Sequence, residues 1–452
     1  MPAIMMATCS PGVFGAGARS SAGTASPQIA CTKRQPLDLK GNSEMTRRKL
    51  LLIMIDGLSA DYFEKYHSRL PAMSSLAEEG YLVRRLQSAV PGTSMPGRAS
   101  ILTGTGAEVH GVFGNRILSD GIFVAAEAEH VLVSTIATLA SRAGYDVACI
   151  GHALINPEDT SVYIPPCWLR GPGFTKIPAD GTIPPLLKVK DPRGRLVTFP
   201  LPSYMPESKE PNEVSRLTGM LIGDQLTVAV AASLIGSEEP PDVVVTEINV
   251  PDAFQHDFGY ESEEAHFAIA FADSLVGLCL DSLRRAGRRD EYTIAIVSDH
   301  GHGNIKTSIL PDLIIPGRVW QSEGATLHVL VENDIDRQEV TERLARFGAE
   351  PWTDSHLPTR IRERIATFVA PAGHDFEETP AHHPAGQPLG QPKYRSTHGF
   401  RPGAPADDRV CIMSGPGIPN AVVDKAEPTR FAPTLARVLG LPLDTFPDRP
   451  LF

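Results

Sequence analysis

A continuous apolar run from Leu50 to Ile55 constrains the fold of this chain more than any other feature, and Asp56-Gly57 follow it directly. A strand with one wetted face alternates apolar and polar residues, whereas a strand buried on both faces reads as an unbroken apolar run. Such strands occur in parallel sheets that carry helices on each side. The run therefore predicts a central strand of an α/β protein with an acidic residue at its carboxyl end.

Further strand and helix patterns alternate along the chain. Strands are predicted at residues 81–90, 146–150, 242–248, 292–297, 326–331 and 409–413. Helices are predicted at 131–143, 213–235, 262–286, 336–347 and 429–439. Within 262–286, helical spacing predicts a core stripe made of Phe267, Phe271, Leu275 and Leu278. The alternation predicts the α/β class, with a mostly parallel central sheet and helices on both faces.

Two stretches interrupt this alternation. Residues 152–211 are rich in proline, and residues 351–396 carry clusters of proline, histidine and glycine. Long insertions of this kind are either lids over a site or surface excursions. The first 45 residues are rich in alanine, serine, glycine and proline and show little periodicity. We therefore expect residues 1–45 to be a disordered tail or a spurious extension, and residues 46–452 to form one domain with two insertions.

The overall charge limits the partners of this chain. Its formal net charge is −11 and no basic stretch compensates locally, which argues against general binding to nucleic acid. A small anionic substrate stays compatible, because bound metal ions would reverse the charge inside a site. Six scattered cysteines without a Cys-x-x-Cys pair indicate reduced thiols. No stretch approaches the roughly 20 apolar residues of a membrane helix. We expect a cytoplasmic protein without a membrane partner, and the sequence does not indicate the oligomeric state.

Acidic and imidazole side chains cluster after the predicted strands and in glycine-flanked fragments. The six residues are Asp56, Asp252, His256, Asp299, His300 and His398. Ligands of open α/β sheets bind at the carboxyl ends of the strands. Carboxylate oxygens and imidazole nitrogens are ligands of zinc and similar divalent ions, and a pair of such ions can clamp a phosphoryl group during its displacement. The sequence therefore predicts a metal site at one edge of the sheet.

A hydroxyl lies where a further helix is predicted to begin. Pro96 suits the first turn of that helix, and Ser94 is a good N-cap. A helix N-terminus offers free N–H groups to a phosphate, and coordination to a metal ion favours the alkoxide of a serine. Ser94 and Thr93 are the two competing nucleophiles. Asn115 lies in the loop that follows, where an amide donor can bond a transition-state oxygen.

Taken together, the fragments resemble the alkaline phosphatase superfamily, and within it most the nucleotide pyrophosphatase/phosphodiesterase branch. The matching pieces are Ile53-Met54-Ile55-Asp56-Gly57, residues 93–111, Asp252 to His256, Asp299-His300-Gly301, His398-Gly399 and Glu427 to Leu435. The resemblance implies an alkaline phosphatase-like catalytic domain over residues 46–452. It also implies hydrolysis of phosphoric esters with two divalent ions, most simply Zn²⁺, and a covalent phosphoryl-enzyme intermediate. The expected substrate is a small phosphate ester or phosphonate.

The resemblance also assigns a role to each residue. One ion is held by Asp252, His256 and His398 and the other by Asp56, Asp299 and His300, while Ser94 is both the nucleophile and a metal ligand and Asn115 contacts a phosphate oxygen. The branch usually has threonine as nucleophile. Alignment on Pro96 and residues 100–104 selects Ser94 and leaves Thr93 in reserve.

A sulfatase is one alternative, because Ser94-Met95-Pro96-Gly97-Arg98 also resembles the sulfatase signature, whose first residue is oxidised to formylglycine. Two departures count against it. Sulfatases usually begin with paired aspartates where this chain has Asp56-Gly57. They hold a hard ion such as calcium with Asp followed by Asn or Gln, whereas Asp299-His300 suits zinc better.

Three further alternatives stay open. Phosphonoacetate hydrolase shares the metal set, and its specificity depends on lysines, for which the 152–211 insertion offers Lys176, Lys188 and Lys190. Cofactor-independent phosphoglycerate mutases have similar motifs but usually a larger insertion. A non-catalytic binding protein of the same fold would lack ligands, and here all six are present. His302, His382 and His383 lie near the site fragments but outside the predicted ligand set.

Overall fold

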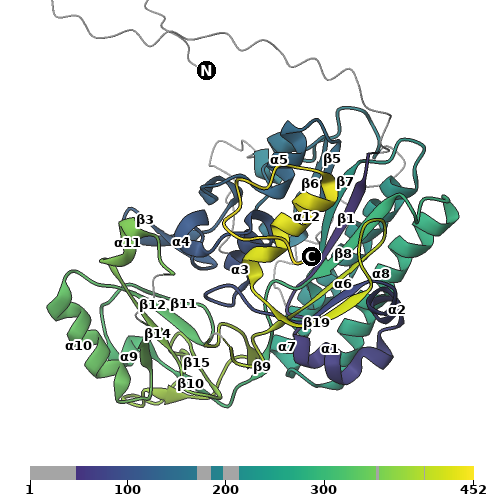
Figure 1. The fold of residues 1–452 in the computed structure, drawn as a ribbon. Helices are drawn as coiled ribbons and strands as arrows, with labels where there is room; N and C mark the ends of the chain where they lie inside the picture. The colour runs from purple at the N-terminus through teal and green to yellow at the C-terminus, as the bar shows by residue number, and fades with distance from the viewer. Residues whose placement is uncertain (1–46, 171–184, 197–212, 353–355, 402) are drawn as a thin grey trace, which may run out of the picture. The chain divides into compact units, whose positions relative to one another are not determined.

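An eight-stranded sheet forms the centre of the fold, and β1 (Lys49–Ile55) lies in its interior (Figure 1). The strand order is β19-β2-β18-β8-β1-β7-β5-β6. β1 is parallel to β7 and β8, and the antiparallel pairs of this sheet are those that β18 makes with β8 and β2. The other strands are β2 (Tyr81–Leu86), β5 (Val147–Ile150), β6 (Val162–Ile164), β7 (Val243–Ile248), β8 (Tyr292–Val297), β18 (Arg409–Ser414) and β19 (Ala421–Ala426). The predicted mostly parallel sheet is confirmed.

The structure is a computed structural model that describes residues 47–170, 185–196, 213–352, 356–401 and 403–452. The described part of the chain from Arg47 to Phe452 forms one compact unit. Residues 1–45, for which we expected a tail, lie outside the described residues, and so does Lys176.

Helices cover both faces of the sheet, because the side chains of β1 alternate between two buried cores. Leu50, Leu52 and Met54 point to one core and Leu51, Ile53 and Ile55 to the other. The first core is completed by α3 (Ser94–Thr103), α5 (Ile136–Arg142) and α12 (Phe431–Leu439). The second is completed by α1 (Ala60–Tyr66), α2 (Pro71–Glu79), α6 (Glu213–Gly236), α7 (Val250–Phe258) and α8 (Glu263–Arg285). Burial on both faces is the reason for the unbroken apolar run.

The two long helices α6 and α8 are long and apolar enough to cross a membrane by length and composition alone, which the sequence analysis did not anticipate. They pack against each other, and 44% and 50% of their most apolar windows are buried inside the fold. A helix that covers the core of a folded domain meets the same criterion. The finding is therefore weak evidence for a membrane span.

Residues between β9 (Gly303–Asn304) and β17 (Ser396–Thr397) form a cap with its own core. Its sheets have the orders β11-β12-β14-β13 and β15-β10-β16. The strands are β10 (Thr307–Ile309), β11 (Trp320–Ser322), β12 (Thr326–Leu330), β13 (Glu350–Trp352), β14 (Ile365–Val369), β15 (His374–Phe376) and β16 (Leu389–Gly390), and α10 (Asp334–Ala345) lies among them. The predicted strand 326–331 therefore exists, but in the cap and not in the central sheet. The cap also begins well before the predicted insertion at 351.

The sequence-based prediction also omitted one strand of the central sheet and placed one side chain wrongly. The edge strand β19 escaped prediction because it alternates half-buried and exposed residues instead of forming an apolar run. Phe267 was expected in the core stripe of α8, but its side chain is 54% exposed, whereas Leu275 is buried as expected. The stripe is therefore narrower than the helical spacing predicted.

Candidate active site

The N-terminus of α3 presents Ser94 to the strand ends. Thr93 is the N-cap residue, with extended backbone (φ −132°, ψ 168°), and Ser94 is the first helical residue. This corrects the prediction of Ser94 as N-cap. Ser94 Oγ lies 3.2 Å from His300 Nε2 and is partly exposed, whereas Thr93 is fully buried. Of the two competing hydroxyls, Ser94 is the one that faces the predicted ligands.

Gly97 allows this helix to touch the end of β8. A Cβ atom at position 97 would lie 2.1 Å from the carbonyl oxygen of Asp299 and 2.7 Å from its carbonyl carbon. Both are main-chain atoms, so they cannot move aside as the tip of a flexible side chain would. The first turn of α3 can rest on Asp299 only because residue 97 has no side chain.

The predicted residues of one ligand set come together at the carboxyl ends of β1 and β8. His300 Nε2 lies 3.2 Å from Asp56 Oδ1 and 3.8 Å from Asp299 Oδ2. All three side chains are buried, and their potential ligand atoms lie within 4.8 Å of one another. Gly57 supports the turn after β1, since it adopts φ +72° and its N–H donates to Asp299 Oδ1 at 3.2 Å.

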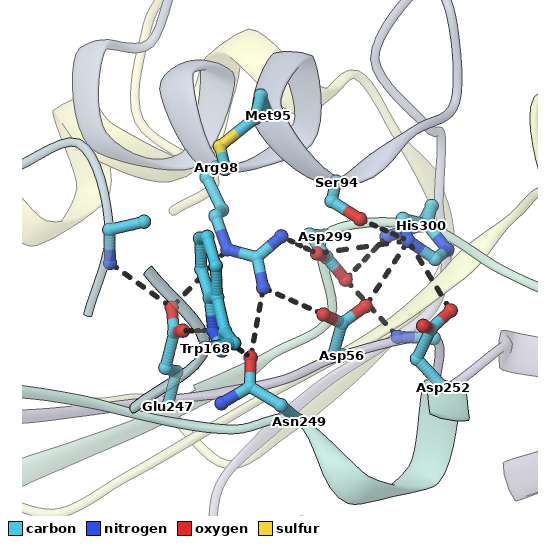
Figure 2. A network of polar contacts seen from close by, with 12 residues as sticks. Asp56, Ser94, Met95, Arg98, Trp168, Glu247, Asn249, Asp252, Asp299 and His300 are labelled. Carbon is cyan, nitrogen blue, oxygen red and sulfur yellow. Dashed lines mark hydrogen bonds and ion pairs between the residues drawn. The ribbon is translucent and has the colours of Figure 1, made fainter. Parts of the chain in front are cut away.

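A buried arginine on α3 holds these carboxylates (Figure 2). Arg98 is 1% exposed, and its guanidinium donates to Asp56 Oδ2 at 2.7 Å and to Asp299 Oδ2 at 2.8 Å. Its Nε donates to Glu247 Oε2 at 3.2 Å. Trp168, from the 152–211 insertion, lies 5.6 Å from the guanidinium and donates to Glu247 Oε1 at 3.0 Å. One oxygen of Asp56 is thereby fixed by Arg98, which leaves Oδ1 directed at His300.

The second set gathers around one oxygen of Asp252 at the start of α7. His256 Nε2 lies 3.3 Å and His302 Nε2 3.1 Å from Asp252 Oδ1. His398 lies against this group, because its ring centroid is 5.1 Å from that of His256 and 4.1 Å from that of His300. Potential ligand atoms of Asp252, His300 and His398 also lie within 4.8 Å of one another. All six predicted ligands are therefore neighbours, and His302 joins them.

These donor sets fit divalent cations. The Nδ1 atoms of His256 and His300 bond the carbonyl oxygens of Ser396 and Gly301 at 2.8 and 2.9 Å. A carbonyl only accepts, so each Nδ1 carries a proton, and in the neutral imidazole each Nε2 has a lone pair that faces a carboxylate oxygen. Among the described residues, Asp56 Oδ1 and His398 Nδ1 are buried without a hydrogen-bond partner. Lone pairs that face one another in a buried cluster favour bound cations, and the mix of imidazole and carboxylate suits zinc.

The electrostatics of the cluster point the same way. Burial raises the pKa of Asp299, and the nearby carboxylate of Asp56 raises it further. Burial lowers the pKa of His300, but Asp299 and Asp56 oppose this effect and raise it to about 10. Burial raises the pKa of Asp252, yet His256 and His302 hold it well below its usual range. The carboxylates stabilise positive charge at this place, and divalent ions would supply it.

Asn115 faces the same helix terminus and is held from the cap. Its Oδ1 accepts the Met95 N–H at 2.8 Å, so the amide nitrogen is the group left to donate to a ligand. Glu323 of the cap accepts the Asn115 N–H at 2.7 Å and the Thr93 hydroxyl at 3.2 Å. Burial raises the pKa of Glu323 to about 7, although these donors lower it. Glu323 thus links Thr93 to the loop that carries Asn115.

Four further residues belong to the site but were not predicted from the sequence: Arg98, Glu247, Trp168 and Glu323. A signal existed for Glu247, because an acidic residue inside the fully buried strand β7 requires a buried partner. Trp168 and Glu323 carry no local signal, since their positions depend on loops that fold back over the sheet. Of the lysines weighed for phosphonate specificity, Lys176 lies outside the described residues. Lys188 is exposed, and Lys190 donates to the carbonyls of Pro157 and Thr160 at 2.8 and 2.5 Å.

The chain belongs to the family of type I phosphodiesterases and nucleotide pyrophosphatases, whose model matches residues 50–401. This confirms the predicted resemblance. Human ectonucleotide pyrophosphatase/phosphodiesterase family member 1 is 22% identical over 254 residues, which are 56% of this chain and 23% of that protein. An arylsulfatase from Clostridium perfringens is 34% identical over 112 residues, which are 24% of this chain and 21% of that enzyme. The chain thus spans about a quarter of the length of the curated relatives it matches.

Among solved structures, human ectonucleotide pyrophosphatase/phosphodiesterase 5 has the same fold. The TM-score is 0.61 at 16% sequence identity, and the match covers 89% of this chain and 100% of that chain. At this identity the likeness shows the fold alone. It confirms the predicted α/β architecture, while the role of each site residue rests on the geometry of this chain.

We predict that Gly97→Ala destabilises the protein by about 1–3 kcal/mol or more, because the added methyl group pushes α3 away from Asp299. Gly277→Ala is the matched control, since Gly277 lies inside α8 and a Cβ there would meet only Ala72 Cβ at 3.8 Å. The control should be neutral or stabilising by roughly 0.5–1 kcal/mol. Urea denaturation of both variants measures the difference. Equal midpoints would contradict the close packing of α3 on β8.

Proposed function

We propose that this protein is a metal-dependent hydrolase of phosphoric esters, with phosphodiesters or nucleotide pyrophosphates as substrates and Ser94 as nucleophile. The observation that carries the proposal is the position of Ser94 Oγ, 3.2 Å from His300 Nε2, at a helix N-terminus beside two sets of potential ligands. The family described above supports the reaction class, because its type I phosphodiesterases and nucleotide pyrophosphatases act on phosphoric ester bonds.

Two divalent ions, which we propose to be Zn²⁺, fit the site. Asp56, Asp299 and His300 would hold one ion together with Ser94, and Asp252, His256 and His398 would hold the other. When bound, such ions neutralise charge on a phosphoryl group and favour the serine alkoxide. Imidazole in both sets favours zinc over calcium or magnesium, which prefer oxygen ligands.

We propose that hydrolysis proceeds in two displacement steps at phosphorus, with Ser94 as the nucleophile of the first. In the first step Ser94 Oγ forms a bond to phosphorus, the bond from phosphorus to the leaving oxygen breaks, and the serine proton passes to solvent while the leaving oxygen takes up a proton. In the second step a water oxygen bonds phosphorus, the bond to Ser94 Oγ breaks, and the serine regains a proton. The sum is the addition of one water across the ester bond.

Asn115 and α3 stabilise the charge that develops on the phosphoryl oxygens. Met95 N–H donates to the Oδ1 of Asn115 at 2.8 Å, so the amide nitrogen is the side-chain group left to donate to a phosphoryl oxygen. A single preorganised donor of this kind contributes roughly 10²–10³ in rate. The N-terminus of α3 adds N–H groups and the positive end of its dipole. Glu323 fixes the Asn115 backbone, so this donor is oriented before substrate binds.

A sulfate ester is the second candidate substrate, and the relative from Clostridium perfringens is the observation that favours it. The imidazole of His300 among the ligands argues for a phosphate ester, because an imidazole binds zinc better than the calcium ion that sulfatases hold. Lys190, one of the lysines considered for phosphonate specificity, is bonded to backbone carbonyls, which counts against its binding a phosphonate substrate. A small phosphorylated substrate and a cytoplasmic location stay predictions.

The first test compares substrate classes on the zinc-loaded full chain. Bis(4-nitrophenyl) phosphate should be hydrolysed faster than 4-nitrophenyl phosphate, phosphonoacetate or 4-nitrophenyl sulfate. EDTA should abolish the activity and added Zn²⁺ should restore it. Fastest turnover of the sulfate, with a formylglycine mass at residue 94, would overturn the assignment.

The second test separates the two hydroxyls. We predict that Ser94→Ala lowers kcat for the diester by at least about a thousandfold, because the nucleophile is removed. Thr93→Val removes a hydroxyl that bonds only Glu323 and Asn115 among the described residues, so it should cost at most about tenfold. Metal content measured on both variants controls for loss of the site. Normal turnover in Ser94→Ala with a large loss in Thr93→Val would move the nucleophile to Thr93.

A further inference from the structure

His302 lies outside the predicted ligand set, yet its side chain is fully buried beside Asp252. Strand β9 pairs antiparallel with β17, so that Asn304 is opposite Ser396 and Gly303 is opposite Thr397. The next step of this register brings His302 opposite His398, and their ring centroids are 5.8 Å apart. The pairing of two distant segments therefore delivers a further imidazole to the Asp252 group.

Hydrogen bonds fix which nitrogen of His302 carries its proton. Ser396 Oγ lies 2.6 Å from the Gln255 carbonyl oxygen, and a carbonyl cannot donate, so the hydroxyl proton of Ser396 points there. The same Oγ lies 2.8 Å from His302 Nδ1, and its remaining role is to accept. His302 Nδ1 therefore carries a proton, and neutral His302 has its lone pair on Nε2.

That lone pair points at a carboxylate oxygen that a second imidazole also faces. His302 Nε2 lies 3.1 Å and His256 Nε2 3.3 Å from Asp252 Oδ1, and the Nδ1 proton of His256 is donated to the Ser396 carbonyl at 2.8 Å. When both imidazoles are neutral, their Nε2 atoms and the Asp252 oxygen are all acceptors, and the potential ligand atoms of the three residues lie within 4.8 Å of one another. Three acceptors that converge in a buried place repel one another unless a shared cation binds them.

We propose that His302 is a direct ligand of the ion held at Asp252 and His256. This inference rests on the two-ion function proposed above, and it adds a residue to it. With His398, the ion site at Asp252 then has three imidazoles and one carboxylate, so a bound divalent ion keeps a net positive charge there. Such a ligand set favours zinc or cobalt over calcium and magnesium, and the positive charge attracts an anionic phosphoryl group. Ser396 is the residue that orients two of these imidazoles.

The test measures metal binding on the full chain, with Co²⁺ and Zn²⁺ as probes. Wild-type protein should bind two ions per chain. His302→Ala should lower the affinity for one ion by at least about a hundredfold, which is the upper end of the loss caused by removing an outer-sphere partner. The affinity for the other ion should be unchanged. The visible absorption of the Co²⁺ protein should change at the same time, since it reports the ligands of cobalt. His382→Ala is the matched control, because His382 is an exposed histidine, and it should behave as wild type.

The His302→Asn variant distinguishes a metal ligand at position 302 from a residue that only orients Asp252. It also replaces His302→Ala in the experiment if that variant does not fold. If His302 only donates a hydrogen bond to Asp252, the amide of His302→Asn should restore both the affinity and the wild-type cobalt spectrum, which would overturn the proposal. Unchanged metal binding in His302→Ala, or a wild-type protein that binds no ion at Asp252, would also overturn it. Wild-type protein that binds two ions without hydrolysing phosphate esters would contradict the proposed function and leave His302 as a ligand.

Discussion

The hydrogen bonds from the buried guanidinium of Arg98 to three carboxylates hold the site together. The guanidinium lies between the carboxylates of Asp56, Glu247 and Asp299, at donor–acceptor distances of 2.7 to 3.2 Å. Three buried carboxylates without a cation would repel one another and would be too costly to keep ionised. Removing one partner from a buried pair costs roughly 3–5 kcal/mol, since it leaves an uncompensated charge. Arg98 therefore makes it possible to bury acidic ligands in the middle of an apolar sheet.

The position of Arg98 couples these ligands to the nucleophile. Arg98 and Ser94 are four residues apart on α3, so they lie on the same face of the helix. Gly97 brings that face into contact with the backbone of Asp299. The helix that carries the hydroxyl thus also carries the cation that orients the carboxylates. The cap closes the site from the other side, where Glu323 holds Asn115 and Thr93 and β17 leads into His398.

The sequence predicted the parts of the site that depend on local pattern. Asp56, Asp252 and Asp299-His300 follow apolar runs that are long enough to be recognised as buried strands, and the ends of parallel strands meet at one edge of a sheet. His302 gave no such signal, because its place depends on the pairing of β9 with β17, about 90 residues further along the chain. The cap was misjudged for the same reason. β13, β15 and β16 have two or three residues each, too few to show a period, and their partners are distant.

Anomalous X-ray diffraction at the zinc edge, from crystals of the zinc-loaded full chain, would show whether Arg98 and the strand ends together build a site for two ions beside Ser94. We predict two anomalous peaks per chain, one in contact with Asp56, Asp299 and His300 and one in contact with Asp252 and His256. Peaks found only at exposed histidines such as His382, or no peak beside Asp56 and Asp299, would contradict the account.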